Sequence, residues 1–169
     1  MSELKRQLHT IPPVYDSNSR ILILGSFPSV KSREYGFFYG HPQNRFWRML
    51  AAVLNEETPT SIPDKKAFLL RHRIALWDVI ASCTIEGSSD ASVKDAVPVD
   101  IRQVTDSAKI EQVLCNGSLA GKLYQQHFQG ITGLPPVILP STSPANAAWS
   151  LSRLVEAWKP QLTDTIYNP

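Results

Sequence analysis

The chain has 169 residues, of which 43% are hydrophobic and 19% are charged. This composition is typical of a globular protein and excludes disorder as the main state. Lysine and arginine exceed aspartate and glutamate by 17 to 15, a net charge of +2, so charge alone does not indicate a nucleic-acid-binding protein. The length predicts a single domain over residues 1–169, large enough to bury a core without disulfides or a structural metal.

Several classes of protein are disfavoured by missing patterns. Cys83 and Cys115 are not in a C-x-x-C spacing, so we expect free thiols in a reducing, cytoplasmic environment. No apolar run approaches the roughly 20 residues that a membrane helix needs, so we expect no membrane partner. Neither a Walker loop nor a G-x-G-x-x-G fingerprint is present, and no metal-ligand spacing occurs. We therefore expect a monomer without metal or cofactor.

Apolar runs alternate with helical patterns along the chain. Residues 20–24, 75–80, 112–115 and 136–139 are short apolar runs, which predict strands buried on both faces, as in a parallel sheet. Helical spacing is expected over residues 46–54, 62–73, 101–107, 118–128 and 145–158. Strands that alternate with helices predict a layered α/β fold with right-handed crossovers.

A parallel sheet of this kind binds ligands beyond the carboxyl ends of its strands. That rule places residues 25–44, 78–90, 116–118 and 140–146 along one edge of the predicted sheet. Most of the polar chemistry of the chain lies in these segments. They are the place to look for a site.

The first of these segments is Gly25-Ser26-Phe27-Pro28-Ser29, directly after the first strand. Its small residues allow the backbone to approach a ligand closely, although a plain turn would look the same. An aromatic segment follows, residues 35–47, in which rings bracketed by glycines could stack on a nucleobase. Within it, Asn44 is either a helix cap or an amide that holds water or a base, and His41 reads more readily as structural than as a base.

Other polar residues on this edge also have two interpretations. Asp78 ends the second strand and either bonds loop amides or belongs to the site. Asp90 either caps a turn, which we favour, or contacts DNA. Ser118 and Lys122 follow Asn116-Gly117 at the start of a helix, which is either a phosphate-binding site or a plain helix cap. Asn146 either belongs to a stiff loop with Pro140 and Pro144 or caps the last helix.

Four segments together resemble the uracil-DNA glycosylase superfamily, and within it most closely the hypoxanthine-DNA (deoxyinosine) glycosylase family. They are residues 25–29 (GSFPS), 40–47 (GHPQNRFW), 76–83 (LWDVIASC) and 139–146 (LPSTSPAN), in the order of that family. The resemblance spans about residues 21–158. It implies a three-layer α/β/α sandwich with a central four-stranded parallel sheet. It also implies an enzyme that flips a deaminated base out of DNA and hydrolyses its N-glycosidic bond.

The resemblance assigns roles to individual residues. The first motif of the superfamily usually has Asp or Asn two residues after its glycine, where this chain has Phe27. The hypoxanthine branch uses the asparagine of H-P-x-N, which corresponds to Asn44 as the catalytic residue. The aromatic residue before that segment corresponds to Tyr39, as the ring that stacks on the base. The expected base-binding residues are Gly25, Ser26, Phe27, Pro28, Ser29, Tyr39, Gly40, His41 and Asp78. The expected DNA-binding residues are Ser118, Lys122, Ser141, Thr142, Ser143, Pro144 and Asn146.

The leading hypothesis is thus a monofunctional DNA glycosylase whose partner is DNA containing deaminated bases, chiefly hypoxanthine. Three alternatives stay open. One is a uracil- or mismatch-directed glycosylase, and another is a non-catalytic nucleic-acid-binding module on the same scaffold. The third is an enzyme that acts on free nucleosides.

Overall fold

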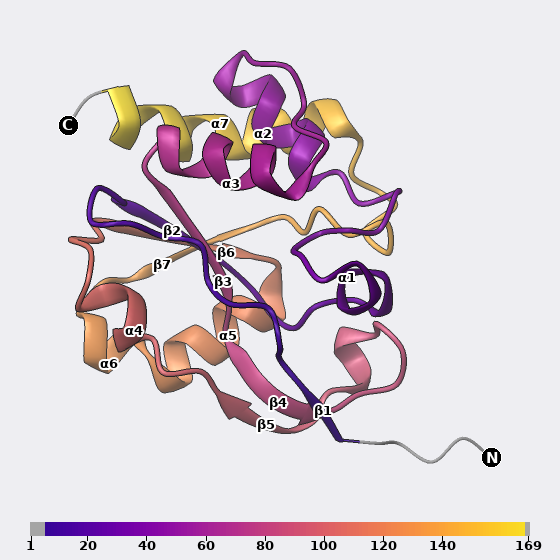
Figure 1. The fold of residues 1–169 in the computed structure, drawn as a ribbon. Helices are drawn as coiled ribbons and strands as arrows, with labels where there is room; N and C mark the ends of the chain where they lie inside the picture. The colour runs from indigo at the N-terminus through magenta and orange to yellow at the C-terminus, as the bar shows by residue number, and fades with distance from the viewer. Residues whose placement is uncertain (1–5, 168–169) are drawn as a thin grey trace.

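The computed structural model describes residues 6–167, with side chains described as far as residue 163. At its centre lies a parallel sheet of four strands in the order β3-β2-β6-β7 (Figure 1). These strands are β2 (Ile21–Gly25), β3 (Ile74–Asp78), β6 (Gln112–Asn116) and β7 (Pro136–Leu139). Each predicted apolar run contributes one of them, and β2 and β3 are buried at every position. The expectation of burial on both faces was wrong for residues 136–139, because β7 lies at the edge of the sheet and is only partly buried.

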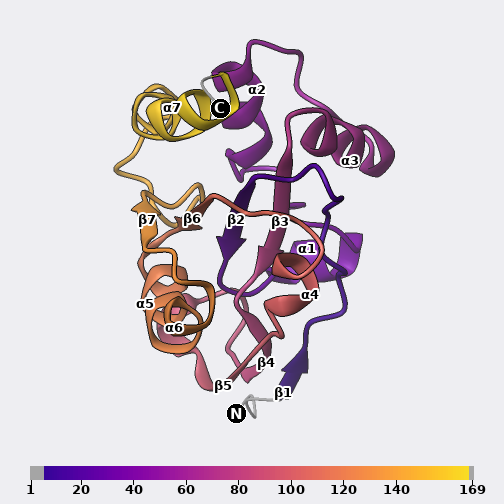
Figure 2. The ribbon, with the colours of Figure 1, turned by 90° about the vertical axis from the view of Figure 1, so that its left-hand side faces the viewer.

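Helices cover both faces of this sheet and complete the three layers. On one face lie α2 (Phe46–Leu54), α3 (Ile62–Arg71) and α7 (Leu151–Tyr167). On the other lie α4 (Arg102–Thr105), α5 (Ser118–His127) and α6 (Gln129–Thr132), and Figure 2 shows the same separation after a quarter turn. A short helix, α1 (Val30–Tyr35), follows β2. The expected α/β/α sandwich is confirmed.

A second sheet extends the molecule beyond β3. It is antiparallel, in the order β1-β4-β5, and consists of β1 (Arg6–Leu8), β4 (Ile80–Thr84) and β5 (Lys94–Pro98), with the 3-10 turn η1 (Asp90–Ser92) before β5. The prediction of one strand over residues 75–80 was wrong at its end. The chain leaves the parallel sheet after Asp78, and Ile80 then begins a strand that pairs with β1 and β5.

The last helix also begins later than predicted. The helical spacing suggested a start at residue 145, whereas α7 starts at Leu151. Residues 142–149 instead form turns in which the Asn146 and Trp149 amides donate to the carbonyls of Ser143 and Asn146. The amide of Arg153 donates to the Ser150 hydroxyl at the true helix start. Asn146 therefore does not cap this helix.

The core lies between the sheet and the two helical layers. Leu154 and Trp158 of α7 are fully buried, and Phe46 contacts the Trp158 ring edge-on at 6.3 Å between ring centroids. Cys83 and Cys115 are buried free thiols. No helix in the described part of the chain is long and apolar enough to cross a membrane.

Candidate active site

The polar residues of the predicted edge meet where three strands end. Gly25 is the last residue of β2 and pairs with Asp78, the last residue of β3. On the other side of β2, β6 ends at Asn116. Because β2 has neighbours on both sides that are reached by different crossovers, its carboxyl end is a topological switch point, where such sheets bind ligands.

Only glycine at position 25 leaves room for the Asp78 carboxyl and the Tyr39 hydroxyl beside the end of β2. A Cβ atom at this position would lie 2.4 Å from Asp78 Oδ1 and 2.8 Å from the Tyr39 hydroxyl. Both distances are shorter than real Cβ contacts, so a side chain here would displace these two groups. Gly25, Tyr39 and Asp78 are thus brought together, as the predicted base-binding set requires.

Tyr39 is held in an unusual way. Its backbone φ is +54°, a conformation that non-glycine residues adopt at a cost. Its ring stacks on Phe46, with 4.1 Å between the ring centroids. Its hydroxyl is buried and makes no hydrogen bond of normal geometry within the described residues. Burial is the main cause that raises the pKa of this hydroxyl far above its usual value, and the negative charge of Asp78 is the second. The Asn116 side chain lowers the pKa by less than these two effects raise it, so the hydroxyl stays protonated.

Asn44 links three segments through one oxygen. Its Oδ1 accepts from the amide of Phe46 at 2.9 Å, a bond that caps the start of α2. The same oxygen accepts from the Thr142 hydroxyl at 2.9 Å. Asn116 completes the cluster, since its Nδ2 donates to Thr142 Oγ1 and its Oδ1 accepts from the Thr142 amide, both at 3.0 Å. The Phe46 amide and the Thr142 hydroxyl both donate to Asn44 Oδ1, so Nδ2 is the end of the Asn44 side chain that remains for a ligand.

The loop at residues 141–146 is fastened to α2 by Arg45. The Arg45 guanidinium donates to the backbone carbonyls of the loop and of the segment after it: Thr142 (3.3 Å), Ser143 (2.8 Å), Asn146 (3.2 Å) and Trp149. Arg45 therefore has an internal, structural role. Within the loop, Asn146 Nδ2 donates to the Ser141 carbonyl at 3.0 Å.

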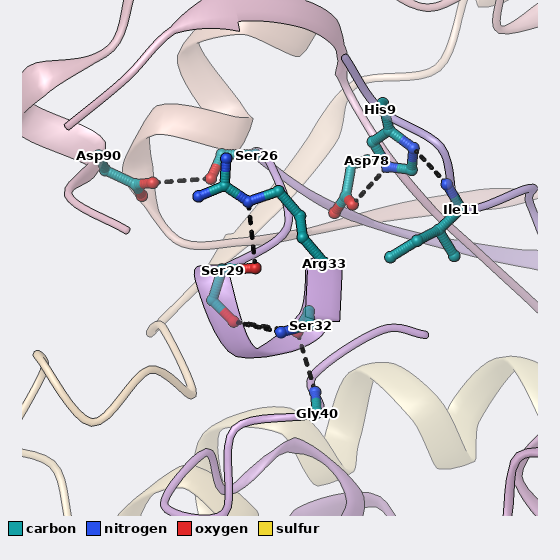
Figure 3. Close-up of polar contacts among 9 residues, drawn as sticks. All are labelled: His9, Ile11, Ser26, Ser29, Ser32, Arg33, Gly40, Asp78 and Asp90. Carbon is teal, nitrogen blue, oxygen red and sulfur yellow. Dashed lines mark hydrogen bonds and ion pairs between the residues drawn. The ribbon is translucent and has the colours of Figure 1, made fainter. Parts of the chain in front are cut away.

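The loop after β2 is bonded on two sides (Figure 3). Ser29 caps α1 by accepting from the Ser32 amide, and the Ser32 hydroxyl accepts from the Gly40 amide at 2.9 Å. Ser26 Oγ donates to Asp90 Oδ1 at 2.8 Å. The prediction that Asp90 caps a turn was therefore wrong. Desolvation raises the Asp90 pKa, the Ser26 hydrogen bond opposes this, and the charge of Asp78 adds to it.

Asp78 has a partner that sequence reasoning missed. His9 Nε2 lies 2.8 Å from Asp78 Oδ2, and each side chain is only 4% exposed (Figure 3). The Ile11 amide donates to His9 Nδ1 at 3.3 Å, so the proton of the neutral ring is on Nε2 and is donated to Asp78. The two residues are 69 positions apart, and no local pattern relates them. The only available signal was a histidine next to a short alternating segment.

The remaining predicted residues lie around this centre. Phe27 and Pro28 are buried, and the Phe27 ring meets the His9 ring edge-on at 6.0 Å. His41 accepts from the Gln43 amide through Nδ1, which fits its structural interpretation. Ser118 and Lys122 are exposed on α5, and Gly117 before them lies against Ser141.

An α/β/α sandwich with a buried glycine at the switch point of its parallel sheet, and an amide cluster near it, fits the class of uracil-DNA-glycosylase-like proteins. A family model described as the uracil DNA glycosylase superfamily matches residues 12–162. The chain belongs to this superfamily.

Two individual relatives and one solved structure are similar to this chain over most of its length. The chain is 37% identical over 144 residues to a Methanosarcina acetivorans protein named hypoxanthine DNA glycosylase, covering 84% of this chain and 90% of the relative. It is 36% identical to the protein of that name from Methanosarcina barkeri, covering 80% and 85%. A solution NMR structure from Methanosarcina acetivorans, described as a candidate uracil DNA glycosylase, matches with a TM-score of 0.77 and 34% identity over 90% of this chain and 94% of that one.

Proposed function

We propose that this protein is a DNA glycosylase that releases hypoxanthine from deoxyinosine in DNA and leaves an abasic site. Membership of the superfamily supports hydrolysis of an N-glycosidic bond, and the names of the two Methanosarcina relatives support hypoxanthine as the base. The observation that carries the proposal within the structure is the pairing of a bare glycine edge with Asp78 and Tyr39 beside the Asn44 cluster.

In this proposal the flipped base enters at Gly25. Asp78 Oδ1, which packs against Gly25, then meets the edge of the purine ring. One face of the Tyr39 ring is stacked on Phe46, and the proposal assigns the opposite face to the flipped base. Ser26, Ser29, Gly40 and His41 shape the loops around the proposed base site through hydrogen bonds to Asp90, Ser32 and Gln43.

Asn44 is the proposed catalytic residue, and its orientation defines what it can do. Its Oδ1 is occupied by two donors, so the side chain acts through the two hydrogens of Nδ2. Those hydrogens can hold the oxygen of the attacking water or stabilise negative charge on the departing base. They cannot accept a proton. Asn44 thus positions rather than deprotonates.

Weak activation of water is sufficient for this reaction. The sugar acquires oxocarbenium character as the bond to the base breaks, so the water adds to a centre that is already electron-poor. Phe27 stands where other members have an acid or amide, and it is buried against His9. The rate then depends on holding the base, through Tyr39 and Asp78, and on the Asn44 amide.

The enzyme is proposed to be monofunctional. Lys65, the buried lysine of the described region, has its ammonium between the Tyr35 and Trp47 rings, at 5.2 Å from each, rather than at the pocket edge. No other lysine is placed there by a contact among the described residues. Release of the base without strand cleavage is the expected outcome.

Duplex oligonucleotides with a single deoxyinosine, deoxyuridine or deoxyxanthosine test the proposal. Free hypoxanthine should appear, and the strand should break only after alkali. Release of uracil in preference would favour the uracil-directed alternative. Binding without base release would identify a non-catalytic module, and hydrolysis of free deoxyinosine but not of DNA would identify a nucleoside hydrolase.

A further inference from the structure

We propose that His9 is a specificity-determining positioning residue, which holds Asp78 as a hydrogen-bond acceptor for the ring N–H that deamination adds to a base. The proposal rests on the proposed function. His9 lies before residue 12, where the match to the superfamily begins, so it is a feature of this chain outside the matched region.

The first step is how the N-terminal segment reaches the site. β1 pairs with β4 in an antiparallel register that aligns Leu8 with Ser82, and the His9 amide then donates to the Ala81 carbonyl at 2.8 Å. β4 follows β3 after a single residue, so this pairing carries His9 back to Asp78 at the end of β3. The His9 ring is enclosed by Phe27 and Phe38, with ring centroids at 6.0 Å and 6.1 Å.

The second step is which Asp78 oxygen remains for a ligand. His9 Nε2–H donates to Oδ2, which fixes the plane of the carboxyl group. The other oxygen, Oδ1, is the one directed at Gly25, and no hydrogen-bond partner for it occurs among the described residues. A buried carboxylate needs such a donor, because an uncompensated charge in this environment is costly. His9 therefore fixes Oδ1 as an acceptor beside Gly25, where the proposed function places the edge of the flipped base.

The third step is what an acceptor selects. Adenine has an unprotonated N1, which is itself an acceptor and would face Oδ1 with repulsion. Deamination to hypoxanthine places a hydrogen on N1, and this N–H can donate to Oδ1. A site built to bond a substrate N–H rejects analogues that lack it much more strongly than a site of matching shape alone. Guanine also has an N1–H, so this contact separates hypoxanthine from its parent adenine and not from guanine.

Substitutions at His9 separate donation from packing. His9→Gln keeps an amide N–H at the reach of Nε2, whereas His9→Leu keeps bulk without a donor. The matched control is His72→Leu, because His72 also pairs with a carboxylate, Glu56, but between α2 and α3. Each protein is assayed on one duplex carrying either hypoxanthine or unsubstituted purine, which has no N1–H. The ratio of the two rates on one preparation is independent of the folded fraction.

Wild type should release hypoxanthine much faster than purine. His9→Leu should lower the hypoxanthine rate by about 10- to 100-fold, as expected for one hydrogen bond to a charged group, and change the purine rate by less than about threefold. His9→Gln should restore most of the ratio, and His72→Leu should not alter it. An unchanged ratio in His9→Leu, a His9→Gln as poor as His9→Leu, or an equal change in His72→Leu would each overturn the inference. Wild type that released no hypoxanthine would instead refute the proposed function and the inference with it.

Discussion

At the residue scale, Asn44 has two ends with different tasks. Its oxygen accepts from the Phe46 amide and the Thr142 hydroxyl, and so serves the fold. Its nitrogen is the end that we assign to the reaction. The two interpretations that the sequence left open, cap and catalyst, are compatible because they use different atoms.

Two substitutions of Asn44 distinguish these ends. Asn44→Asp keeps an acceptor for both donors but has no N–H, whereas Asn44→Ala loses both. We expect each to lower hypoxanthine release by about 10²–10³, the usual effect of losing one positioned transition-state contact. Only Asn44→Ala should also lose about 1 kcal/mol of unfolding free energy, by thermal or denaturant melting, through the lost cap. An Asn44→Asp enzyme with near wild-type rate would show that the amide hydrogens are not needed.

Substitutions of Tyr39 are predicted to affect activity and stability differently. Tyr39→Ala should weaken activity strongly, because a stacked ring is worth roughly 1–3 kcal/mol per base. Tyr39→Phe keeps the ring and removes a buried hydroxyl without a partner, so it should be mild in activity and equal or higher in melting temperature. If both variants lost activity equally, the hydroxyl rather than the face would be the functional part.

At the element scale, the loop at residues 141–146 is rigid for reasons that the structure makes explicit. Pro140 and Pro144 restrict its backbone, Arg45 holds its carbonyls, and Asn146 closes it on Ser141. A rigid loop at the carboxyl edge can press into a duplex and offset part of the few kcal/mol that base extrusion costs. This is the role that we propose for it.

Loosening this loop should affect duplex DNA most. The double variant Ser143→Gly with Asn146→Gly removes the bonds to the Ala145 amide and to the Ser141 carbonyl. We expect hypoxanthine release to fall more on duplex than on single-stranded DNA, because a single strand exposes its base with less help. Ser17→Gly with Asn18→Gly, in the exposed turn before β2, controls for two added glycines. Equal losses on both substrates would assign the loop to binding or folding instead.

The elements that sequence patterns could and could not predict differ in burial. β2, β3 and β6 were predictable because their apolar runs are almost entirely buried, and α2 because its apolar residues repeat on one face. β7 was predicted from its apolar run although it is only partly buried at the edge of the sheet. β1 and β5 are short and largely exposed, so they have no such pattern. Their pairing with β4 depends on contacts distant in sequence. The same limit hid His9, whose role depends entirely on that pairing.

The start of α7 illustrates a second limit. Helical spacing from residue 145 onward was real, but Arg45, at the N-cap of α2, binds four carbonyls between residues 142 and 149, and this segment forms turns. Side-chain contacts from elsewhere thus replaced a local preference. In the site, the family resemblance assigned roles to Asn44 and Tyr39, which stay predictions, whereas the Ser26–Asp90 bond was found only in three dimensions.

At the scale of the whole molecule, function is concentrated at one edge. The ends of β2, β3 and β6 and the loop after β7 all lie at the carboxyl edge of the sheet, so DNA is expected to meet the protein there. The net charge is only +2, so phosphate binding must come from a few local cations rather than from an overall field. Lys122, exposed on α5, is the cation that we propose for this task.

Salt dependence tests that proposal. Lys122→Ala should weaken binding to duplexes of any sequence and reduce the slope of log affinity against log salt by about 1. Lys109→Ala, at an exposed position near the amino end of β6, should change neither quantity and serves as the control. Fluorescence anisotropy over a salt series provides the measurement. Equal slopes for Lys122→Ala and wild type would exclude a phosphate contact at this residue.

The central claim is that this fold releases hypoxanthine from DNA by hydrolysis. Its most direct measurement is a single-turnover incubation of excess protein with a duplex containing one deoxyinosine, followed by chromatography of the released base. We predict free hypoxanthine in an amount equal to the alkali-sensitive abasic sites, no cleavage before alkali, and release slower by about 10²–10³ with Asn44→Asp. A folded wild-type protein that binds this duplex but releases no base would contradict the account.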